Sequence, residues 1–461
     1  MDKHSSPLET AYALLERSIM MHNGQPVGTV AACDPEVVAP NYEECFVRDF
    51  VPSAIVFLLD GKYDIVCNFL VAVLNLRHQQ KVMAGHQRAP GLLPASFKQL
   101  NDGTLKADFG DLAIGRVAPV DSAMWWMILL RAYVIASNDH ELVQRDDFQE
   151  GIRLILDLYL KESFETSPAM LVPDASFMID RRMGVYGHPL EIQALFYGML
   201  QAAQDLLLPN DLNARYIDIV TKRKHSLCSY VRIYYWLDIP RLNEIHRLKT
   251  EEFGEDVSNV LNIHPEIIPD WMDGWLGLDS GYLVGNLGPS RMDFRFFSLG
   301  NFLSILLGLA TDAQSTRIMN VVDSHWDELV GEMPMKIVYP AEVGERWAWV
   351  TGRDPKNVPW SYHNGGNWPA IIWPFVASAI ITGRTDLAER AMATALQRLP
   401  VDNWPEYYDG RKGSLIGRRA NFFQTWSATS VIIAHRLLEN PDALLAFQQL
   451  FSPVPDKIDV G

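Results

Sequence analysis

Two kinds of predicted helix alternate along this chain, and their alternation restricts the folds that it can adopt. Helices that are apolar on every side, such as the one predicted over 123–136, must be buried. Each is followed by a helix with a single apolar side, such as 141–161, where apolar residues recur at steps of three and four. Because the pair occurs six times, we predict an all-α fold, an (α/α)6 barrel with six inner and six outer helices.

The predicted barrel takes in the whole chain. The inner helices are expected over 46–59, 123–136, 189–207, 296–309, 370–381 and 426–438, and their outer partners over 63–81, 141–161, 212–236, 312–330, 386–398 and from 441 onward. Residues 1–461 would then form one catalytic domain, with 1–25 as a peripheral N-terminal helix.

Each inner helix follows a short motif of charged, aromatic or amide residues. The densest motif, residues 360–368, reads Trp-Ser-Tyr-His-Asn-Gly-Gly-Asn-Trp. Inner helices of such a barrel are parallel, so the long loops that precede them gather at one mouth. Helix capping alone would explain the Asp, Asn and Pro of these motifs, but not the neighbouring Trp, Tyr, Arg and Gln. The motifs therefore favour one shared pocket.

Composition excludes several classes of partner. A net charge of -16 disfavours binding to nucleic acid or to an anionic membrane, both of which require a basic face. The longest apolar stretch, 368–381, is too short to span a bilayer and contains two prolines. The N-terminus lacks the features of a secretory signal, and the four cysteines have no metal-ligand spacing, so we expect a cytoplasmic protein without a metal.

The chemistry points to carboxylates. The sequence contains no G-x-G-x-x-G, P-loop, G-x-S-x-G or H-E-x-x-H motif. Paired carboxylates among aromatic and amide groups are what glycosidic bond cleavage needs, and Asp180 and Glu406 are the favoured pair. Spacing alone leaves competing carboxylates at Asp49, Asp121, Asp174, Glu191, Asp293 and Asp409.

Other mouth residues are candidates for substrate binding, because tryptophan can stack on a sugar ring and charged or amide groups can bond its hydroxyls. They are Arg48, Asp49, Asp121, Trp125, His188, Asp293, Arg295, His363, Asn364, Trp368, Trp404, Gln424 and Trp426. For Trp125 core packing is an equal alternative, and His188 could instead cap a helix.

The motifs resemble those of one known family, the alkaline/neutral invertases (glycoside hydrolase family 100). The matching segments are Phe46–Ser53, Ile114–Ser122, Met178–Phe196, Arg291–Asn301, Asp354–Pro369 and Asn403–Gly410. The resemblance implies an (α/α)6 barrel that hydrolyses sucrose to glucose and fructose without a cofactor. It also implies Asp180 as the general acid, Glu406 as the general base, and the possibility of a homo-oligomer.

The resulting hypothesis is inverting hydrolysis of sucrose, with the two carboxyl groups about 6.5–9.5 Å apart to admit a water molecule. One alternative is another α-glucosidase or trehalase-type activity on the same barrel. A second is a non-catalytic sugar-binding protein, and a third is a purely structural ring of helices, which leaves the repeated motifs unexplained.

Overall fold

The computed structural model describes most of the chain. The described residues are 6–34, 43–77, 82–83, 86–87, 89–110, 119–160, 168–172, 177–179, 181–247, 263, 265–288 and 291–452. The predicted acid Asp180 and its competitor Asp174 lie outside them.

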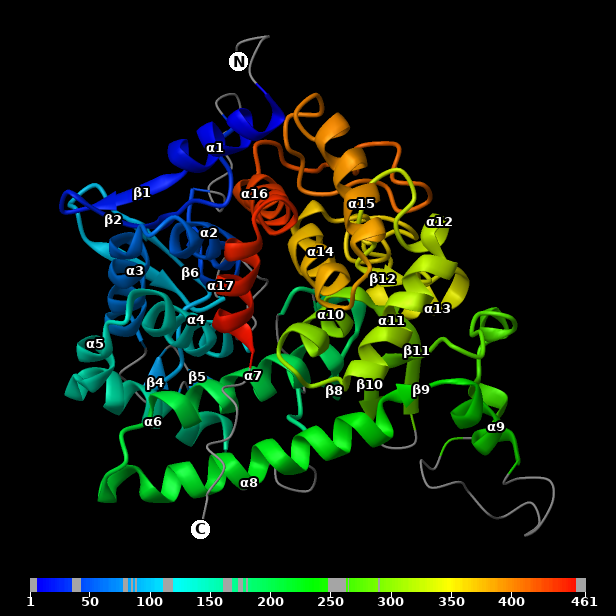
Figure 1. Cartoon of the computed structure of the whole chain (residues 1–461), viewed down its shortest axis with the longest axis horizontal. Helices are drawn as coiled ribbons and strands as arrows, with labels where there is room; N and C mark the ends of the chain where they lie inside the picture. Colours follow the sequence, from blue (N-terminus) through cyan, green and yellow to red (C-terminus); the bar gives the residue numbers. More distant parts are fainter. Residues whose placement is uncertain are drawn as a thin grey trace.

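Six buried helices of the described residues pack in a closed cycle (Figure 1). They are α2 (Val47–Leu59), α4 (Ser122–Ser137), α7 (Leu190–Leu206), α10 (Ser298–Leu306), α14 (Ile372–Ile381) and α16 (Thr425–Glu439). Each contacts the next in this order, and α16 contacts α2. Within α4 every residue from Ser122 to Val134 is buried, as expected for a helix that is apolar on all sides. The predicted inner helices are therefore present as a ring.

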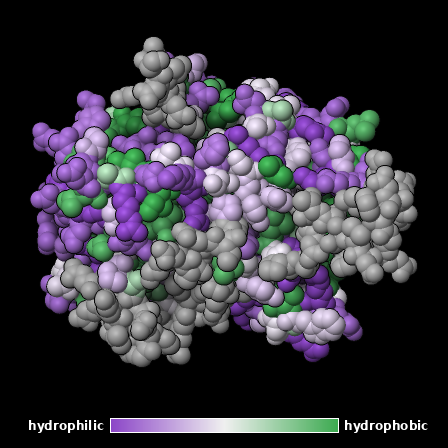
Figure 2. Space-filling model, turned by 90° about the horizontal axis from the view of Figure 1, so that it is seen from below, coloured by the Kyte–Doolittle hydropathy of each residue, from purple (hydrophilic) through white to green (hydrophobic). Residues whose placement is uncertain are grey.

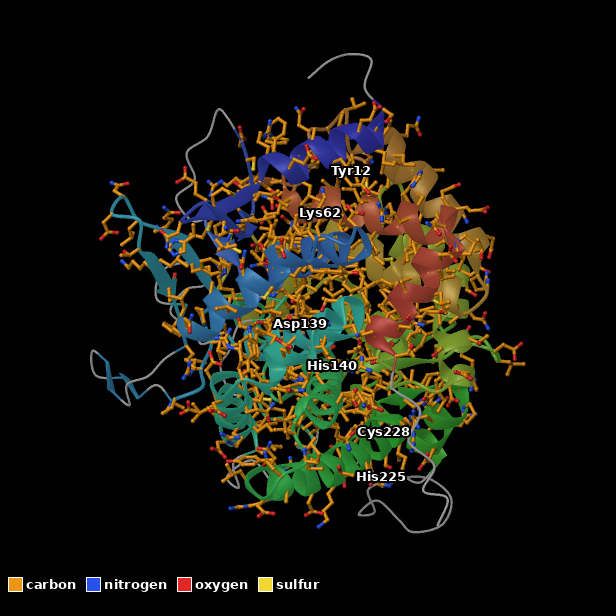
Figure 3. All side chains as sticks on the ribbon, turned by 60° about the vertical axis from the view of Figure 1, so that its left-hand side comes forward. Tyr12, Lys62, Asp139, His140, His225 and Cys228 are labelled. Carbon is orange, nitrogen blue, oxygen red and sulfur yellow. The ribbon has the colours of Figure 1, made fainter. Side chains whose placement is uncertain are left out.

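Helices with one buried side lie against this ring. They are α1 (Pro7–Arg17), α3 (Tyr63–Asn75), α6 (Asp146–Tyr159), α8 (Asp211–Tyr234), α11 (Asp312–Ser324) and α15 (Thr385–Arg398). Helix α1 packs on α16 and α15, whereas the last helix, α17 (Pro441–Phe451), contacts α4, α16 and α2. The helix beside α16 on the outside is thus α1 rather than the expected C-terminal one. Figure 3 shows α1, with Tyr12, and α8, with His225 and Cys228, on opposite sides of the molecule.

Shorter helical segments complete the described ranges. They are α5 (His140–Gln144), α9 (Ile239–Arg247), α12 (Trp326–Leu329), α13 (Gly344–Thr351) and the 3-10 turns η2 (Arg181–Met183), η3 (Pro265–Ile267), η4 (Asp270–Met272) and η5 (Pro369–Ile371). No helix among these residues is both long and apolar enough to cross a bilayer. The face seen in Figure 2 is largely hydrophilic, with scattered hydrophobic residues.

The structure also contains strands, which corrects the prediction of an all-α chain. Among the described residues β10 (Tyr282–Gly288) pairs with β11 (Arg291–Phe297), β8 (His188–Pro189) and β9 (Trp236–Leu237), and β11 also pairs with β12 (Val338–Tyr339). Smaller sheets join β1 (Ile19–His22) to β2 (Gln25–Thr29), β6 (Ser96–Gln99) to β3 (Cys45–Phe46) and β7 (Leu105–Asp108), and β4 (Val82–Met83) to β5 (His86–Gln87).

The strand β11 replaces the beginning of a predicted helix. The helix expected from Phe296 begins at Ser298, because Arg291–Phe297 is held by backbone hydrogen bonds to β10. Charged residues at 291, 293 and 295 of β11 alternate with apolar residues at 292, 294 and 296, yet both faces of the strand are buried from Met292 onward.

Contacts between the starts of the ring helices show that these ends lie together. Arg48 of α2 bonds Asp121, the residue before α4, and Trp368, just before η5 and α14, contacts Trp426 of α16. The amide of Ser298 at the start of α10 donates to the carbonyl of Ile337, in the segment next to the loop before α14. The expected gathering of the motifs at one end therefore holds for these residues.

Candidate active site

Glu406 lies in the long loop between α15 and α16, with only 3% of its surface exposed. Its Oε2 accepts hydrogen bonds from the backbone N–H of Asn421 (3.3 Å) and from the Asn421 side-chain amide (3.1 Å). The Nζ of Lys356 lies 3.9 Å from the same oxygen. The structure thus fixes the orientation of a buried carboxylate and places a cation beside it.

The loop that carries Glu406 is joined to the motif at 360–368. Asn367 and Tyr408 exchange two backbone hydrogen bonds of 3.0 and 2.8 Å. A Cβ atom on Gly410 would lie 1.6 Å from the carbonyl oxygen of Gly365, so only glycine permits this approach. Left-handed backbone conformations, which are costly for residues other than glycine and gather at functional sites, occur in these two loops at Trp360, Tyr362, Asn403, Trp404, Arg419 and Phe423.

Asp49, in the first turn of α2, belongs to the same site. Burial, together with the nearby Glu406 and Asp121 carboxylates, raises the pKa of Asp49 to about 7, although Arg48 opposes the shift. Arg48 itself forms its ion pair with the fully buried Asp121, the Nη2–Oδ1 distance being 3.3 Å. Asp49 is therefore a carboxyl group that holds its proton close to neutral pH beside Glu406.

Glu191, at the start of α7, has a similar environment. Its side chain is buried, and its Oε1 accepts the backbone N–H of Met178 (3.1 Å). Burial and the Asp121 carboxylate raise the pKa of Glu191 to about 8. We conclude that the starts of three ring helices bring carboxyl groups together around Arg48.

Several buried polar atoms in this region have no hydrogen-bond partner among the described residues. They are the indole nitrogens of Trp125, Trp404 and Trp426 and both side-chain amide atoms of Gln424. All four residues were predicted to bind substrate. Most buried polar groups in proteins are bonded, so a cluster of unsatisfied ones suggests that a bound molecule completes them.

Aromatic rings pack beside these atoms. Trp368 stacks on Tyr407, next to Glu406, at a centroid distance of 5.4 Å, and meets the edge of Trp426 at 5.7 Å. Its own indole N–H donates to the carbonyl of Tyr362 (3.1 Å). His363 is buried, and its ring stacks on Tyr362 at 4.0 Å. Trp368 and His363 thus form the packed support of the site.

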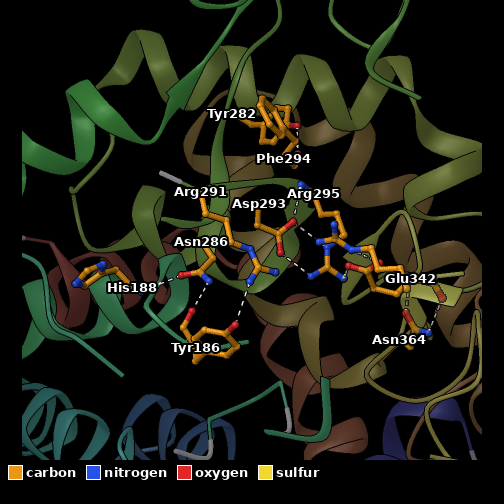
Figure 4. A network of polar contacts seen from close by, with 11 residues as sticks. Tyr186, His188, Tyr282, Asn286, Arg291, Asp293, Phe294, Arg295, Glu342 and Asn364 are labelled. Atoms are coloured by element: carbon orange, nitrogen blue, oxygen red, sulfur yellow. Dashed lines mark hydrogen bonds and ion pairs between the residues drawn. The ribbon is translucent and has the colours of Figure 1, made fainter. Parts of the chain in front are cut away.

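A second polar cluster contains the predicted residues Asp293, Arg295 and Asn364 (Figure 4). Arg295 donates from Nε to Asp293 Oδ1 (2.8 Å), and its Nη1 lies 3.3 Å from Glu342 Oε1. The Asn364 side chain accepts the backbone N–H of Glu342 (2.7 Å) and donates to the Glu342 carbonyl (2.9 Å). Although burial opposes it, Arg295 lowers the pKa of Asp293. The members of this cluster bond one another.

His188 lies in β8, so Pro189 precedes α7 rather than forming its expected first residue. The His188 backbone N–H donates to Asn286 (2.9 Å), its ring Nδ1 lies 3.0 Å from the Leu287 carbonyl, and burial lowers its pKa. His188 therefore holds the sheet against the start of α7.

The predicted acid cannot be placed, because Asp180 lies outside the described residues. Its described neighbours Ile179 and Met183 are buried, and Arg182 Nη1 lies 3.1 Å from Asp354 Oδ2. The predicted spacing between the two carboxyl groups stays a prediction.

Sequence reasoning missed Asn421, Lys356 and Glu342. Asn421 and Glu342 stand in no motif that was recognised, and Lys356 lies within the family-like segment Asp354–Pro369 without an assigned role. Across the described ranges no group of three or more His, Cys, Asp or Glu side chains could hold a metal ion. Cys33, Cys45, Cys67 and Cys228 are free thiols.

Comparison with known proteins decides the family. The family model described as "Alkaline and neutral invertase" matches residues 11–441. The chain belongs to the alkaline and neutral invertase family. The prediction of a glycoside hydrolase of this family is thereby confirmed.

Relatives in plants cover almost the whole chain. "Alkaline/neutral invertase CINV2" of Arabidopsis thaliana is 49% identical over 439 residues, which are 94% of this chain and 78% of that protein. "Neutral/alkaline invertase 1, mitochondrial" of Oryza sativa subsp. japonica is 48% identical over 452 residues, 95% of this chain and 72% of that protein. Other relatives are named as chloroplastic or cytosolic, so family membership does not assign a compartment.

Solved structures with a similar fold include glycosidases. A mannosylglycerate hydrolase from Thermus thermophilus, in complex with Tris and D-glycerate, has a TM-score of 0.57 at 12% identity, covering 93% of this chain and all of that one. A bacterial glucoamylase complexed with acarbose has a TM-score of 0.55 at 11% identity, covering 98% of this chain and 57% of that one. At these identities the likeness concerns the fold alone.

Proposed function

We propose that the chain hydrolyses sucrose to glucose and fructose by a single displacement that inverts the glucosyl carbon. The observation that carries the proposal is Glu406, a buried carboxylate oriented by Asn421 beside tryptophan and glutamine groups without partners among the described residues. Membership of the invertase family names sucrose as the substrate to test first.

In the proposed mechanism Glu406 is the general base. It takes a proton from a water molecule that attacks the glucosyl carbon, and Asp180 gives its proton to the glycosidic oxygen that leaves with fructose. The two hydrogen bonds from Asn421 orient the Glu406 carboxylate, and the Lys356 ammonium lies beside it. The role of Asp180 rests on its place in the family-like segment Met178–Phe196.

The groups without described partners would bind the sugar. Trp125, Trp404 and Trp426 offer donors, and Gln424 offers both a donor and an acceptor. Asp49, with a pKa of about 7, can donate or accept a hydrogen bond near neutral pH. The other predicted residues bond or pack against protein groups as described above, and their part in substrate binding stays a prediction; they are Arg48, Asp121, His188, Asp293, Arg295, His363, Asn364 and Trp368.

For the architecture we propose that the closed cycle of helices is the inner layer of an (α/α)6 barrel in which 1–461 form one domain. The cyclic contacts from α2 to α16 and the one-sided helices around them support it. Assembly into a homo-oligomer and a cytoplasmic location remain predictions.

The deciding experiment is a sucrose hydrolysis assay on the wild type and on Glu406→Gln. We expect kcat to fall about 10³-fold, because general acid–base catalysis contributes roughly 10²–10⁴-fold. Asp409→Asn is the matched control, since Asp409 lies three residues away, is half-buried and accepts the backbone N–H of Arg411 (3.1 Å). A Glu406→Gln enzyme with wild-type kcat would contradict the assignment.

Three further measurements separate the alternatives. Proton NMR should show β-glucose as the first product, whereas α-glucose would exclude a single displacement. Faster release of glucose from trehalose or maltose than from sucrose would favour the α-glucosidase alternative, and calorimetric sucrose binding without products would favour a sugar-binding protein.

Asp49 competes with Asp180 as the proton donor because of its raised pKa. A larger loss of kcat in Asp49→Asn than in Asp180→Asn would assign that role to Asp49.

A further inference from the structure

Asp354 and Lys356, in the loop after α13, contact both segments to which the proposed mechanism assigns a catalytic carboxylate. Lys356 Nζ lies 3.9 Å from Glu406 Oε2 and 3.8 Å from the centre of the Tyr362 ring. Asp354 Oδ2 lies 3.1 Å from Nη1 of Arg182, two residues after Asp180. Two side chains two positions apart therefore contact regions that are more than 200 positions apart in the sequence.

The loop itself is firmly held. Asp354 accepts hydrogen bonds from the backbone N–H of Lys356 and from the Asn357 side-chain amide, both at 2.9 Å. Asn357 is fully buried, and its side-chain oxygen accepts the backbone N–H of His363 (3.1 Å). The Asp354 carboxylate is 10% exposed, so its charge is poorly screened. Removing this charge should destabilise the loop more than removing the charge of a surface carboxylate.

The ring of Tyr362 lies within reach of both cations. Its centre is 3.8 Å from Lys356 Nζ and 5.9 Å from the guanidinium carbon of Arg182. The ring is also packed against those of His363 and Trp368, at centroid distances of 4.0 and 5.1 Å. Tyr362 thus makes a cation–π contact with Lys356 and another with Arg182.

The charged groups around Glu406 come from separate elements. The Glu406 carboxylate raises the pKa of Asp49 on α2, and Arg48 lowers it. Lys356 approaches Glu406 from the loop after α13. The Lys356 ammonium therefore lies beside a carboxylate that also has the Asp49 carboxyl group nearby.

We propose that Asp354 and Lys356 are positioning residues that hold the acid-bearing segment and the base Glu406 in register. The roles of these two residues rest on the proposed function, whereas their positions rest on the observed contacts. Lys356 orients Glu406, and Asp354 holds Arg182, two residues after Asp180, to the same loop. A register error of about 1 Å in such a pair is enough to lower a rate about 10²-fold.

The kinetic test compares Lys356→Met, Lys356→Arg and the exposed control Lys412→Met. Lys356→Met should lower kcat about 10- to 100-fold with KM changed less than about threefold, because the base loses its orientation while the sugar contacts remain. Lys356→Arg should restore most of kcat because it keeps the charge. An unchanged kcat in Lys356→Met, or a loss that Lys356→Arg does not restore, would overturn the proposal.

The structural test does not depend on turnover. Amide hydrogen exchange, followed by mass spectrometry, should become faster over 177–187 in Asp354→Asn and over 403–424 in Lys356→Met, relative to wild type and to Glu345→Gln, an exposed carboxylate on α13. Exchange that changes only near residue 354 would overturn the positioning role. A wild type that does not hydrolyse sucrose would remove the proposed function, while the exchange data still decide whether the two segments are held through this loop.

Discussion

Two polar clusters near the starts of the ring helices contrast in how far the protein satisfies them. In the Asp293–Arg295–Glu342 cluster the charged groups bond one another, and Asn364 bonds the backbone of Glu342 (Figure 4). In the Glu406 region Asn421 orients the carboxylate, yet the indoles of Trp125, Trp404 and Trp426 and the Gln424 amide have no partner among the described residues.

The contrast separates residues that stabilise the fold from residues that bind a ligand. A satisfied buried network rigidifies a fold, and the loss of one member leaves the others uncompensated. Buried donors and acceptors without partners destabilise the empty protein and gain their bonds from a ligand. The two clusters contain similar residue types, so removing one group from each should change different quantities.

The largest expected effect is on stability in the satisfied cluster. Arg295→Met should lower the free energy of unfolding by about 3–5 kcal/mol, because Asp293 would remain buried without its bonded cation and Glu342 would keep only its pair with Arg346. Urea denaturation followed by circular dichroism measures it. Arg346→Met is the control: Arg346 also pairs with Glu342 (2.9 Å), but its side chain is 58% exposed, so about 1 kcal/mol or less is expected.

The outcome that would break the comparison is a stable Arg295→Met protein with a much higher KM for sucrose. Arg295 would then bind the sugar, and its bonds to Asp293 and Glu342 would exist only in the empty protein.

The next effect is on activity in the unsatisfied cluster. Gln424→Leu should lower kcat/KM about 10- to 100-fold, because a sugar hydroxyl would lose its partner, while the stability of the empty protein should not fall. Steady-state kinetics and urea denaturation on the same preparation test both parts.

A tryptophan pair provides the matched control for this prediction. Trp426→Phe removes an N–H that has no partner among the described residues, whereas Trp368→Phe removes one that donates to the Tyr362 carbonyl. We expect Trp426→Phe to lower kcat/KM with little change in stability. Trp368→Phe should cost about 1 kcal/mol of stability, and the reverse pattern would contradict the assignment.

The ring helices could be predicted from sequence because burial on all sides leaves a continuous apolar pattern. Helix α4, buried from Ser122 to Val134, is the clearest case. The strand β11 was missed for a different reason. Its charged residues at 291, 293 and 295 alternate with apolar residues at 292, 294 and 296, which is the period of a strand. The segment was instead interpreted as a motif that opens a helix, because a charged face usually lies in solvent, whereas Asp293 and Arg295 are buried and bond each other.

The site could be predicted as a set of residues but not as a set of partners. The sequence predicts Arg48, Asp49 and Asp121 as separate candidates for sugar binding, whereas Arg48 pairs with Asp121, the residue before another ring helix. The contact of Glu406 with Asn421 depends on how one loop folds back on itself, which no spacing rule gives. Pairings across such distances are set by tertiary packing, and only coordinates reveal them.

A further expected effect concerns Asp49 and the pH dependence of stability. Its pKa is about 7 in the folded protein, against an ordinary value of 3.8. Well below its ordinary pKa the carboxyl group is protonated in both states and costs little. As pH rises toward 7 the unfolded chain ionises first, so folding becomes less favourable, and the penalty is complete once pH passes the folded pKa.

Asp49→Asn removes this penalty, so the variant should gain stability over the wild type as pH rises from about 4 to about 7, and keep a constant gain above that range. A shift of about three pKa units corresponds to about 4 kcal/mol, but because the side chain is only half-buried we expect about 1–2 kcal/mol. Urea denaturation at a series of pH values measures the difference. A difference that stays flat across this range would mean that Asp49 is already ionised beside Glu406, and the unsatisfied region would then hold two charged carboxylates rather than one.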